Sequence, residues 1–241
     1  MLNIKNLEKF TNQNQTSIEN IVREYCQHLF LSYLYKQAEA EKLLFKGGTA
    51  LRIVFNSPRY SEDLDFTGVN IIQKDIEELF IKVLANLENT GIKIALEEGK
   101  STTGGYLGII KFHAYNITTT IQVEVSLRNT KKVGATRVLI ENDYIPAYTL
   151  VHLPEEDIIK EKIEALLSRK KPRDFYDYFF LLSGNYPATK ERKNLEAVLK
   201  LLQKTDINFR NELREFLPNS HAMHLKDFKN ILEQKIQMFL K

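Results

Sequence analysis

The sequence has a single cysteine, Cys26, among its 241 residues. One cysteine excludes an internal disulfide bond and any zinc site built from several cysteines. No apolar stretch approaches the roughly 18 residues that a membrane-spanning helix needs, and the N-terminus lacks the basic and apolar segments of a secretory signal peptide. We therefore expect a cytoplasmic protein in which Cys26 fills apolar space in a helix.

Histidine is also sparse, and its spacing excludes several kinds of site. The five histidines are His28, His113, His152, His221 and His224. His221 and His224 stand three apart, as metal ligands on one helix face can do, but we interpret them as an exposed pair in a loop. No arrangement of Ser, His and Asp indicates a hydrolase. The sequence therefore supports neither zinc chemistry nor hydrolysis.

The two halves of the chain differ in charge. Residues 1–159 carry 17 Lys and Arg against 20 Asp and Glu, whereas residues 160–241 carry 17 against 11, so the net charges are −3 and +6. A basic region indicates a polyanionic partner, although a solvated, lysine-rich helical surface would show the same excess. With 43% apolar and 27% charged residues, the chain is typical of a soluble globular protein.

The periodicity of apolar residues predicts helices in both halves and strands only in the first. In the first half we expect helices from Thr16 to about Glu41, over 49–55 and over 74–90, and strands at 43–45, 63–66, 92–96, 106–112 and 117–127. Beyond Pro154 the pattern is helical, with one helix to about 169, a second from Asp174, and three more near 189–203, 206–216 and 225–240. We therefore expect two domains, residues 1–153 and residues 154–241.

The most informative stretch runs from Lys46 to Phe66. Gly47-Gly48-Thr49 follows an apolar segment, and Asp63-Leu64-Asp65 begins fifteen residues after Gly48. Because glycine lacks a Cβ, backbone N–H groups in such a turn can approach a phosphate closely. Residues two apart on a strand share a face, so Asp63 and Asp65 present two carboxylates together. These parts indicate a site for a nucleoside triphosphate and Mg²⁺, an ion held by one or two carboxylates and phosphate oxygens.

The predicted strand 117–127 alternates strictly between apolar and polar residues. One face carries Ile117, Thr119, Ile121, Val123, Val125 and Leu127, and the other carries Thr118, Thr120, Gln122, Glu124, Ser126 and Arg128. Glu124 is therefore a carboxylate on the polar face of a strand that follows the aspartate pair. An ordinary solvent-facing glutamate is the alternative interpretation.

These residues resemble a known family. Gly47-Gly48-Thr49 with Asp63-Leu64-Asp65 is similar to the opening motif of the polymerase-β-type nucleotidyltransferase superfamily. The longer strings Phe45–Arg52 and Arg59–Phe66 resemble its AbiEii branch, the toxins of bacterial type IV toxin–antitoxin and abortive-infection systems. The resemblance implies an α+β fold, in which a polymerase-β-like nucleotidyltransferase core with a small mixed sheet flanked by helices precedes a C-terminal helical bundle. It also implies a third acidic residue on a later strand; Glu124 is the candidate, although the family often has Asp there.

A second group of residues also resembles the AbiEii branch. In that branch a helical lysine and an aspartate in an Arg-Asp-x-x-Asp setting are further active-site positions. Lys162 matches the lysine, and either Asp174 or Asp177 matches the aspartate; we favour Asp174 because it directly follows Arg173. Lys162 would neutralise triphosphate charge and the aspartate would orient it, whereas spacing alone would make Lys162 an ordinary surface lysine.

The resulting prediction is transfer of a nucleoside monophosphate from a nucleoside triphosphate (NTP) to an acceptor hydroxyl. Asp63, Asp65 and Glu124 would bind Mg²⁺, or Mn²⁺ in its place. The backbone amides of Gly47 and Gly48, the Thr49 hydroxyl and Lys162 would bind the β- and γ-phosphates. Secondary candidates for the site are Lys46, Arg52, Arg59, Ser61, Arg128, Arg169, Arg173 and Asp177. Arg52, Arg59 and Arg128 could equally be structural ion-pair partners.

The resemblance also implies partners. Studied members of the branch act on RNA, in some cases on tRNA 3′ ends, so we expect an RNA acceptor and a cognate antitoxin, and no membrane. A transferase acting on a small molecule or a protein is the competing enzyme hypothesis. A non-catalytic nucleic-acid-binding scaffold is the third, and three clustered carboxylates disfavour it because they would repel a polyanion.

Overall fold

The computed structural model of this chain describes residues 2–127, 133–184, 186–221 and 225–241. The chain forms two compact units. The core unit comprises Met1–Asn56 and Tyr60–Pro154, and the helical unit comprises Ser57–Arg59 and Glu155–Lys241. The three residues Ser57–Arg59 therefore pack with the helical unit although core residues precede and follow them in the chain.

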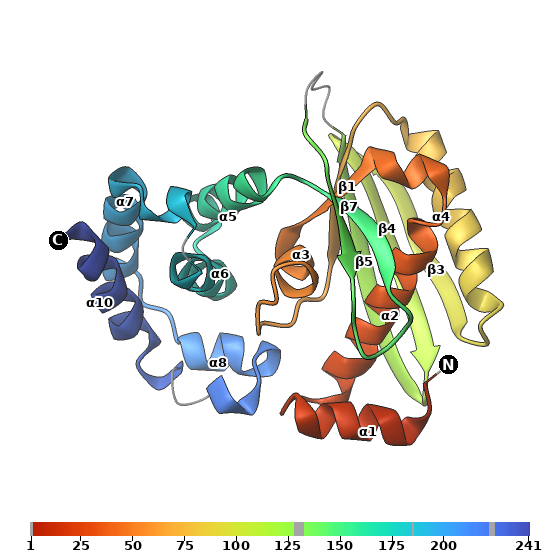
Figure 1. The fold of residues 1–241 in the computed structure, drawn as a ribbon, viewed down its shortest axis with the longest axis horizontal. Coiled ribbons are helices and arrows are strands. Elements are labelled where there is room, and N and C mark those ends of the chain that lie inside the picture. Colours follow the sequence, from red (N-terminus) through yellow and green to blue (C-terminus); the bar gives the residue numbers. More distant parts are fainter. Residues whose placement is uncertain (1, 128–132, 185, 222–224) are drawn as a thin grey trace. The chain divides into compact units, whose positions relative to one another are not determined.

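The core unit is built on a seven-stranded mixed sheet with the strand order β3-β4-β5-β2-β1-β7-β6 (Figure 1). The strands are β1 (Leu43–Lys46), β2 (Leu64–Gly68), β3 (Lys93–Thr102), β4 (Gly105–Ala114), β5 (Ile117–Leu127), β6 (Thr136–Ile140) and β7 (Tyr148–His152). β2 runs parallel to β5 and β1 runs parallel to β7, while the remaining neighbours are antiparallel. The strands that carry the candidate carboxylates, β2 and β5, are thus neighbours in the middle of the sheet.

Helices of the core unit cover one face of the sheet. They are α1 (Ile4–Gln13), α2 (Ile18–Leu34) and α4 (Gln73–Glu88). α2 contacts both α4 and β5, and edge-to-face packing of the Phe30 and Phe80 rings, 5.6 Å apart, joins the two helices. The predicted alternation of β5 is confirmed, because Ile121, Val123 and Val125 are buried whereas Glu124 is exposed. The polar face of β5 is therefore open to ligands.

Two short helices flank β1. η1 (Ala38–Lys42) leads into the strand, and α3 (Gly47–Ile53) begins immediately after it. The predicted continuation of the second helix to Glu41 is wrong, since α2 ends at Leu34. The cause is a tertiary contact: the Tyr35 hydroxyl donates to the carbonyls of Leu43, at 2.7 Å, and Val151, at 2.8 Å. Periodicity also failed to reveal α1, β6 and β7.

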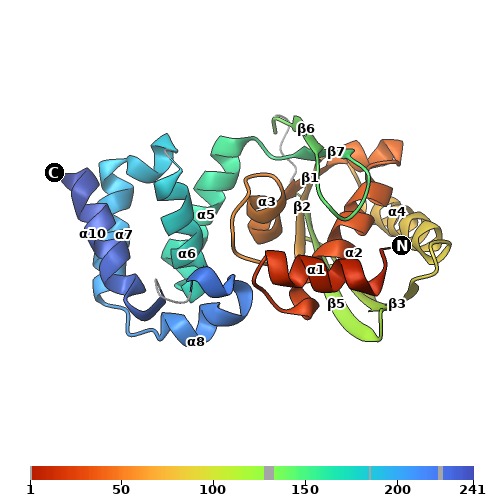
Figure 2. The ribbon, with the colours of Figure 1, turned by 60° about the horizontal axis from the view of Figure 1, so that its bottom comes forward.

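The helical unit consists of α5 (Glu155–Arg169), α6 (Pro172–Ser183), η2 (Pro187–Lys190), α7 (Arg192–Gln203), α8 (Phe209–Leu213), η3 (Arg214–Phe216), η4 (Asn219–His221) and α10 (Phe228–Leu240) (Figure 2). Aromatic side chains join α6 to α8 and α10. The Phe175 ring lies 5.5 Å from that of Phe209, which in turn lies 5.0 Å from that of Phe228. These contacts confirm that the basic half of the sequence forms helices around a core of its own.

Within the described residues, no helix combines the length and the apolar character that crossing a membrane requires.

Candidate active site

The glycine turn lies against one of the candidate carboxylates. Gly47 adopts a left-handed φ of +84°, which favours glycine, and it opens α3 directly after Lys46. A Cβ built on Gly47 would collide with the Asp65 carboxylate and lie 2.7 Å from its Cγ. Glycine is therefore required here both by the backbone conformation and by the close approach of Asp65.

The sheet places two carboxylates side by side. Asp65 on β2 is the direct partner of Glu124 on the parallel strand β5, so both side chains share one face. Lys46 on β1 is the partner of Asp65 on its other side, and the Lys46 ammonium donates to the Ser126 hydroxyl at 3.1 Å. A row of Lys46, Asp65 and Glu124 thus crosses three strands.

A cavity of about 400 Å³ opens on this row. Its lining includes Lys46, Asp65, Glu124 and, from the β3–β4 hairpin, Thr102 and Leu107. The Gln122 amide donates a short hydrogen bond to Glu124 Oε1 from the same exposed face, which fixes the direction of that carboxylate. The arrangement combines negative charge with a partly apolar wall.

The same row can be tested as a metal site. Among the described residues, no group of three or more His, Cys, Asp or Glu side chains lies close enough to hold a metal ion by itself. Asp65 and Glu124 supply adjacent oxygen ligands, and Asp63 lies one residue before β2. Mg²⁺ commonly takes one or two protein carboxylates and completes its shell with water and substrate phosphate oxygens. The residues therefore fit a hard cation that binds together with a triphosphate.

Thr49 lies inside the fold. Its side chain is fully buried, and its hydroxyl donates a short hydrogen bond to the backbone carbonyl of Asp63. We expected this hydroxyl to bind phosphate on the surface, but the structure uses it to join α3 to the residue that begins the carboxylate motif. The contact holds the backbone of Asp63 against α3.

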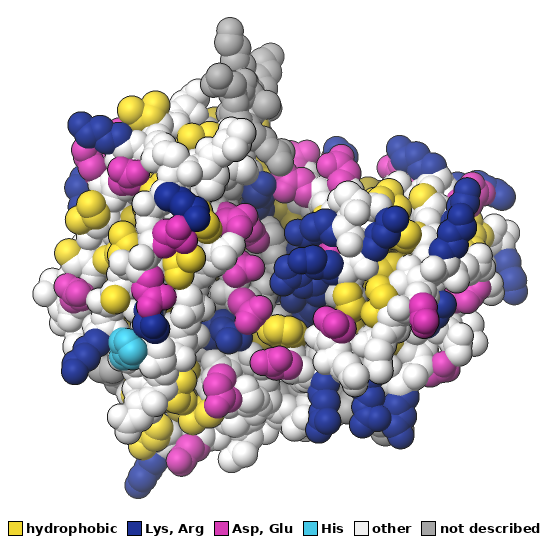
Figure 3. All heavy atoms as spheres, turned by 180° about the vertical axis from the view of Figure 1, so that it is seen from behind, with side chains coloured by type: hydrophobic (Ala, Val, Ile, Leu, Met, Phe, Trp, Pro, Cys, Tyr) yellow, Lys and Arg dark blue, Asp and Glu magenta, His cyan; other side chains and the backbone are white. Residues whose placement is uncertain are grey.

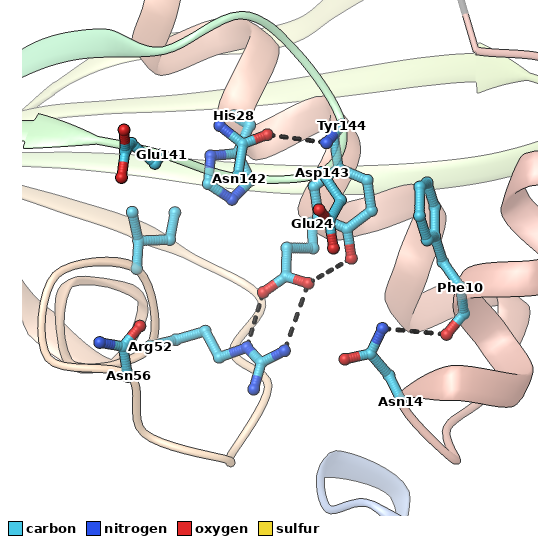
Figure 4. Close-up of a pocket in the computed structure, with 11 residues that line it drawn as sticks. Phe10, Asn14, Glu24, His28, Arg52, Asn56, Glu141, Asn142, Asp143 and Tyr144 are labelled. Carbon is cyan, nitrogen blue, oxygen red and sulfur yellow. Dashed lines mark hydrogen bonds and ion pairs between the residues drawn. The ribbon is translucent and has the colours of Figure 1, made fainter.

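Arg52 belongs to a different cavity of the core unit, of about 250 Å³ (Figure 4). Figure 4 shows its guanidinium against the Glu24 carboxylate, with Nε 2.6 Å from Oε1, while the Tyr144 hydroxyl donates to Glu24 at 2.7 Å. The Arg52 guanidinium also stacks on the Tyr60 ring at 4.0 Å. Of the two roles that the sequence left open, the structure favours an ion-pair partner, and Arg52 does not line the carboxylate cavity.

The helical unit contains a buried ion-pair cluster of Arg59, Lys162 and Asp177. Arg59 contacts Asp177 with two nitrogens, at 2.7 and 3.0 Å, and the Lys162 ammonium lies 2.9 Å from Asp177 Oδ2. Burial alone would raise the pKa of Asp177, but the charges and hydrogen bonds of Arg59 and Lys162 hold it below its ordinary value. Two cations share one carboxylate, which gives the cluster a net charge of +1.

The cluster selects between the two candidate aspartates. Asp177, not the favoured Asp174, contacts Lys162, whereas Asp174 accepts a 2.7 Å hydrogen bond from Arg169. The two residues lie three apart on α6 and are both buried. The packing of α5 on α6 decides which carboxylate reaches the lysine, and the choice of Asp174 as the functional aspartate stays a prediction.

The remaining secondary candidates are dispersed. The Ser61 carbonyl accepts a hydrogen bond from the Gln27 amide at 2.9 Å, which anchors the segment before Asp63 to α2. Arg173 lies in the first turn of α6. Arg128 is outside the described residues. Sequence reasoning did not single out Gln122, although its place two residues before Glu124 on one strand face was visible.

Comparison with known proteins identifies the family of the chain. Residues 29–241 match the family model of the nucleotidyl transferase AbiEii toxin of type IV toxin–antitoxin systems. The chain belongs to this family. It is a nucleotidyltransferase of the AbiEii type, and the resemblance inferred from its motifs is confirmed. The members of this family are toxins of type IV toxin–antitoxin systems, so a cognate antitoxin is the implied partner.

Solved structures share this AbiEii fold. JHP933 from Helicobacter pylori is 20% identical, with a TM-score of 0.64 and 93% of each chain covered. A second Helicobacter pylori structure, provisionally assigned as a nucleotidyltransferase, is 19% identical, with a TM-score of 0.63 and coverage of 93% of this chain and 96% of the other. No curated protein matches the chain. The expected α+β nucleotidyltransferase fold is confirmed.

Proposed function

We propose that this AbiEii protein transfers a nucleoside monophosphate from an NTP to the 3′ hydroxyl of an RNA, with the acceptor end of tRNA as the preferred target. The observation that carries the proposal is the pairing of Asp65 with Glu124 on adjacent parallel strands, directly against the glycine turn. In this arrangement a carboxylate pair meets backbone that only glycine can form. A phosphoryl-transfer site needs both parts.

The reaction is an in-line displacement at the α-phosphorus. The acceptor oxygen forms a bond to phosphorus, the bond to the β-phosphate oxygen breaks, and pyrophosphate leaves. A bound Mg²⁺ would supply Lewis-acid stabilisation of the phosphate charge, and Asp63, Asp65 and Glu124 are the residues that would hold it. Glu124, exposed and oriented by Gln122, is also able to accept the proton of the attacking hydroxyl.

Each of the two units carries groups of its own that suit phosphate. In the core unit, the amides at Gly47 and Gly48 point positive dipoles at an anion, and Lys46 adds a charge beside Asp65. In the helical unit, the Arg59, Lys162 and Asp177 cluster carries a net positive charge that an anion can neutralise. We therefore keep Lys162 as the predicted contact to the β- and γ-phosphates, with Asp177 orienting it.

The acceptor is supported by charge. Residues 160–241 carry a net charge of +6, and many Lys and Arg side chains are visible on the helical unit in Figure 3. Binding of RNA releases counterions from its phosphates, so transfer to RNA should fall steeply as salt is raised, whereas transfer to a small molecule should show a shallow dependence.

The test is incubation of the protein with each labelled NTP, Mg²⁺ and total RNA. Label should enter RNA at its 3′ end in the wild type and not in Asp63→Asn. Label found only in protein or small molecules would reject the RNA acceptor and leave the transferase intact. Expression of the same variant in bacteria separates toxicity from catalysis, because growth arrest should be lost together with transfer.

A further inference from the structure

The link between α5 and α6 is the most basic segment of the chain. Residues 169–173 contain Arg169, Lys170, Lys171 and Arg173 and no acidic residue, and no other five-residue window holds four basic residues. The segment joins the end of α5 to the start of α6, where Pro172 occupies the first turn. A two-residue link therefore carries positive charge at a sharp corner of the helical unit.

The backbone of this corner is held in a costly conformation. Lys170 has a left-handed φ of +58°, and its N–H donates to the Leu166 carbonyl at 3.1 Å. Glycine is the usual residue at such a helix end, and a side chain there costs roughly 1 kcal/mol. Lysine at this position gives up that stability and adds a charge beside Lys171, so the corner is better explained by its charge than by its fold.

The charges of the corner are not neutralised by neighbours. Lys170, Lys171 and Arg173 have no ion-pair partner among the described residues. Elsewhere in the helical unit some exposed cations are paired with carboxylates, namely Lys160 with Glu156 and Asp157, Arg192 with Glu196, and Lys193 with Glu191. Other exposed cations of the described helical unit, such as Lys200, Lys204 and Arg210, also have no ion pair, but they are spread along the chain and do not stand side by side as the corner residues do. Uncompensated cations that are adjacent in the chain favour an anionic partner.

Arg169 is partly preorganised for such a partner. One guanidinium nitrogen lies 2.7 Å from the buried Asp174, while 48% of the Arg169 side chain remains exposed. Asp174 thus fixes the guanidinium plane and leaves its other edge facing solvent. Planar guanidinium groups with free donors suit phosphate oxygens.

The corner also stands at a defined distance from Lys162. Seven residues of α5 separate Lys162 from Arg169, which places both on one flank of the helix and about 10 Å apart along its axis.

We propose that the α5–α6 corner, Arg169 to Arg173, binds the phosphate backbone of the RNA acceptor. This inference rests on the proposed function for the RNA acceptor. It adds a surface, because the corner would grip backbone phosphates without reading the bases. An acidic protein is the competing partner, and the experiment distinguishes the two.

The test variant is Lys170→Gln with Lys171→Gln and Arg173→Gln. Its control is Lys74→Gln with Lys82→Gln and Lys93→Gln, which removes the same charge from exposed positions of the core unit. Transfer is measured to a tRNA-length RNA and to a dinucleotide over a series of salt concentrations. Direct binding of the longer RNA is measured by fluorescence anisotropy over the same series.

For the test variant we expect KM for the long RNA to rise about 10- to 100-fold. The slope of log affinity against log salt should become shallower by about 2, since each single-strand phosphate contact contributes about 0.7. A dinucleotide carries a single internucleotide phosphate, so few backbone contacts can be lost and its KM should change little. The control should behave as wild type.

The possible failures are distinct. Wild-type KM and salt slope in the test variant would overturn the inference while leaving the transferase in place. If the wild type labels no RNA, the proposed function fails. In that case the corner is still supported if the wild type binds RNA in a salt-dependent way and the test variant loses that binding. If the wild type binds no RNA, the corner is rejected as well. Thermal unfolding of each variant checks the fold, and Lys171→Gln with Arg173→Gln repeats the test without altering the left-handed residue.

Discussion

Asp65 and Glu124 in the core unit stand next to each other on neighbouring strands, whereas Asp177 in the helical unit stands between Arg59 and Lys162. The first arrangement gathers like charges at the edge of a cavity. The second buries opposite charges against one another, with Asp177 only 1% exposed. Carboxylates of one chemical type are thus used in two ways within one chain.

The difference teaches how to separate a ligand site from a structural one. Two carboxylates brought together repel each other, and the single ammonium of Lys46 offsets only one of them, so their proximity indicates a ligand. A buried carboxylate between two cations is required by its partners, because removal of one member leaves uncompensated charge in the interior. Substitutions in the carboxylate pair should therefore reduce catalysis with little loss of stability, whereas substitutions in the buried cluster should lower stability in addition to any effect on catalysis through Lys162.

The largest effect is expected for Asp65→Asn. It removes a metal-binding oxygen, so nucleotide transfer should fall by at least about 10⁴-fold, or about 5 kcal/mol of transition-state stabilisation. The free energy of unfolding should change by less than about 1 kcal/mol, since the neutral amide is isosteric. Single-turnover transfer and urea denaturation measure the two quantities, and a variant that is both active and destabilised would break the comparison.

A somewhat smaller effect, on stability, is expected for Asp177→Asn. The substitution removes the carboxylate that contacts both Arg59 and Lys162 in the interior, which should cost about 3 to 5 kcal/mol of unfolding free energy. Asp174→Asn is the matched control on the same helix, because its partner Arg169 is half exposed and can be solvated. Equal losses of unfolding free energy in both variants would show that the cluster stabilises the fold no more than the Asp174–Arg169 pair does.

The third effect is the loss of folding stability at low pH, which should begin in the core unit. Burial lowers the pKa of His28 on α2 to about 4, so between about pH 6.5 and 4 the unfolded chain binds more protons there than the folded one. As the pH falls from about 6.5 to 4, the free energy of unfolding of the core unit should decrease by about 3 kcal/mol in total, at about 1.4 kcal/mol per pH unit.

Asp177 acts in a lower pH window. Arg59 and Lys162 lower the pKa of Asp177 despite burial. The contribution of Asp177 to folding stability is therefore complete above the ordinary aspartate range near pH 4, and it is lost only as the pH falls through the lowered pKa of the folded protein. Hydrogen exchange of peptides from α2 and α6 should therefore show α2 losing protection first. His28→Gln should remove most of the dependence between pH 6.5 and 4, and simultaneous loss in both helices would contradict the assignment.

Much of the site was predictable from short-range pattern. The alternation of residues 117–127 placed Glu124 on the polar face, and β5 confirms it. The Asp63-Leu64-Asp65 spacing predicted two carboxylates on one strand face, but β2 begins at Leu64 and contains only Asp65. The motifs around Gly47 and Lys162 resemble the AbiEii family, which the family match confirms. Local period and local turn chemistry suffice for such features because neighbours in the chain determine them.

What pattern could not supply was the pairing of distant segments. Nothing in the local sequence distinguishes Asp174 from Asp177, and only the packing of α5 against α6 brings Asp177 to Lys162. The end of α2 at Leu34 was missed for the same reason, since the Tyr35 hydroxyl bonds to carbonyls of β1 and β7. Ion pairs and hydrogen bonds of this kind join residues far apart in the chain.

By itself the sequence determined the family, the fold class, the glycine turn and the faces on which the acidic residues lie, because these follow from local spacing. Tertiary structure alone decided that Asp65 is the neighbour of Glu124, that Thr49 supports Asp63 from within the fold, and that Arg59 joins the helical unit. The physical reason is that strand register and buried charge pairing depend on how segments that are distant in the chain pack together, which no local pattern records.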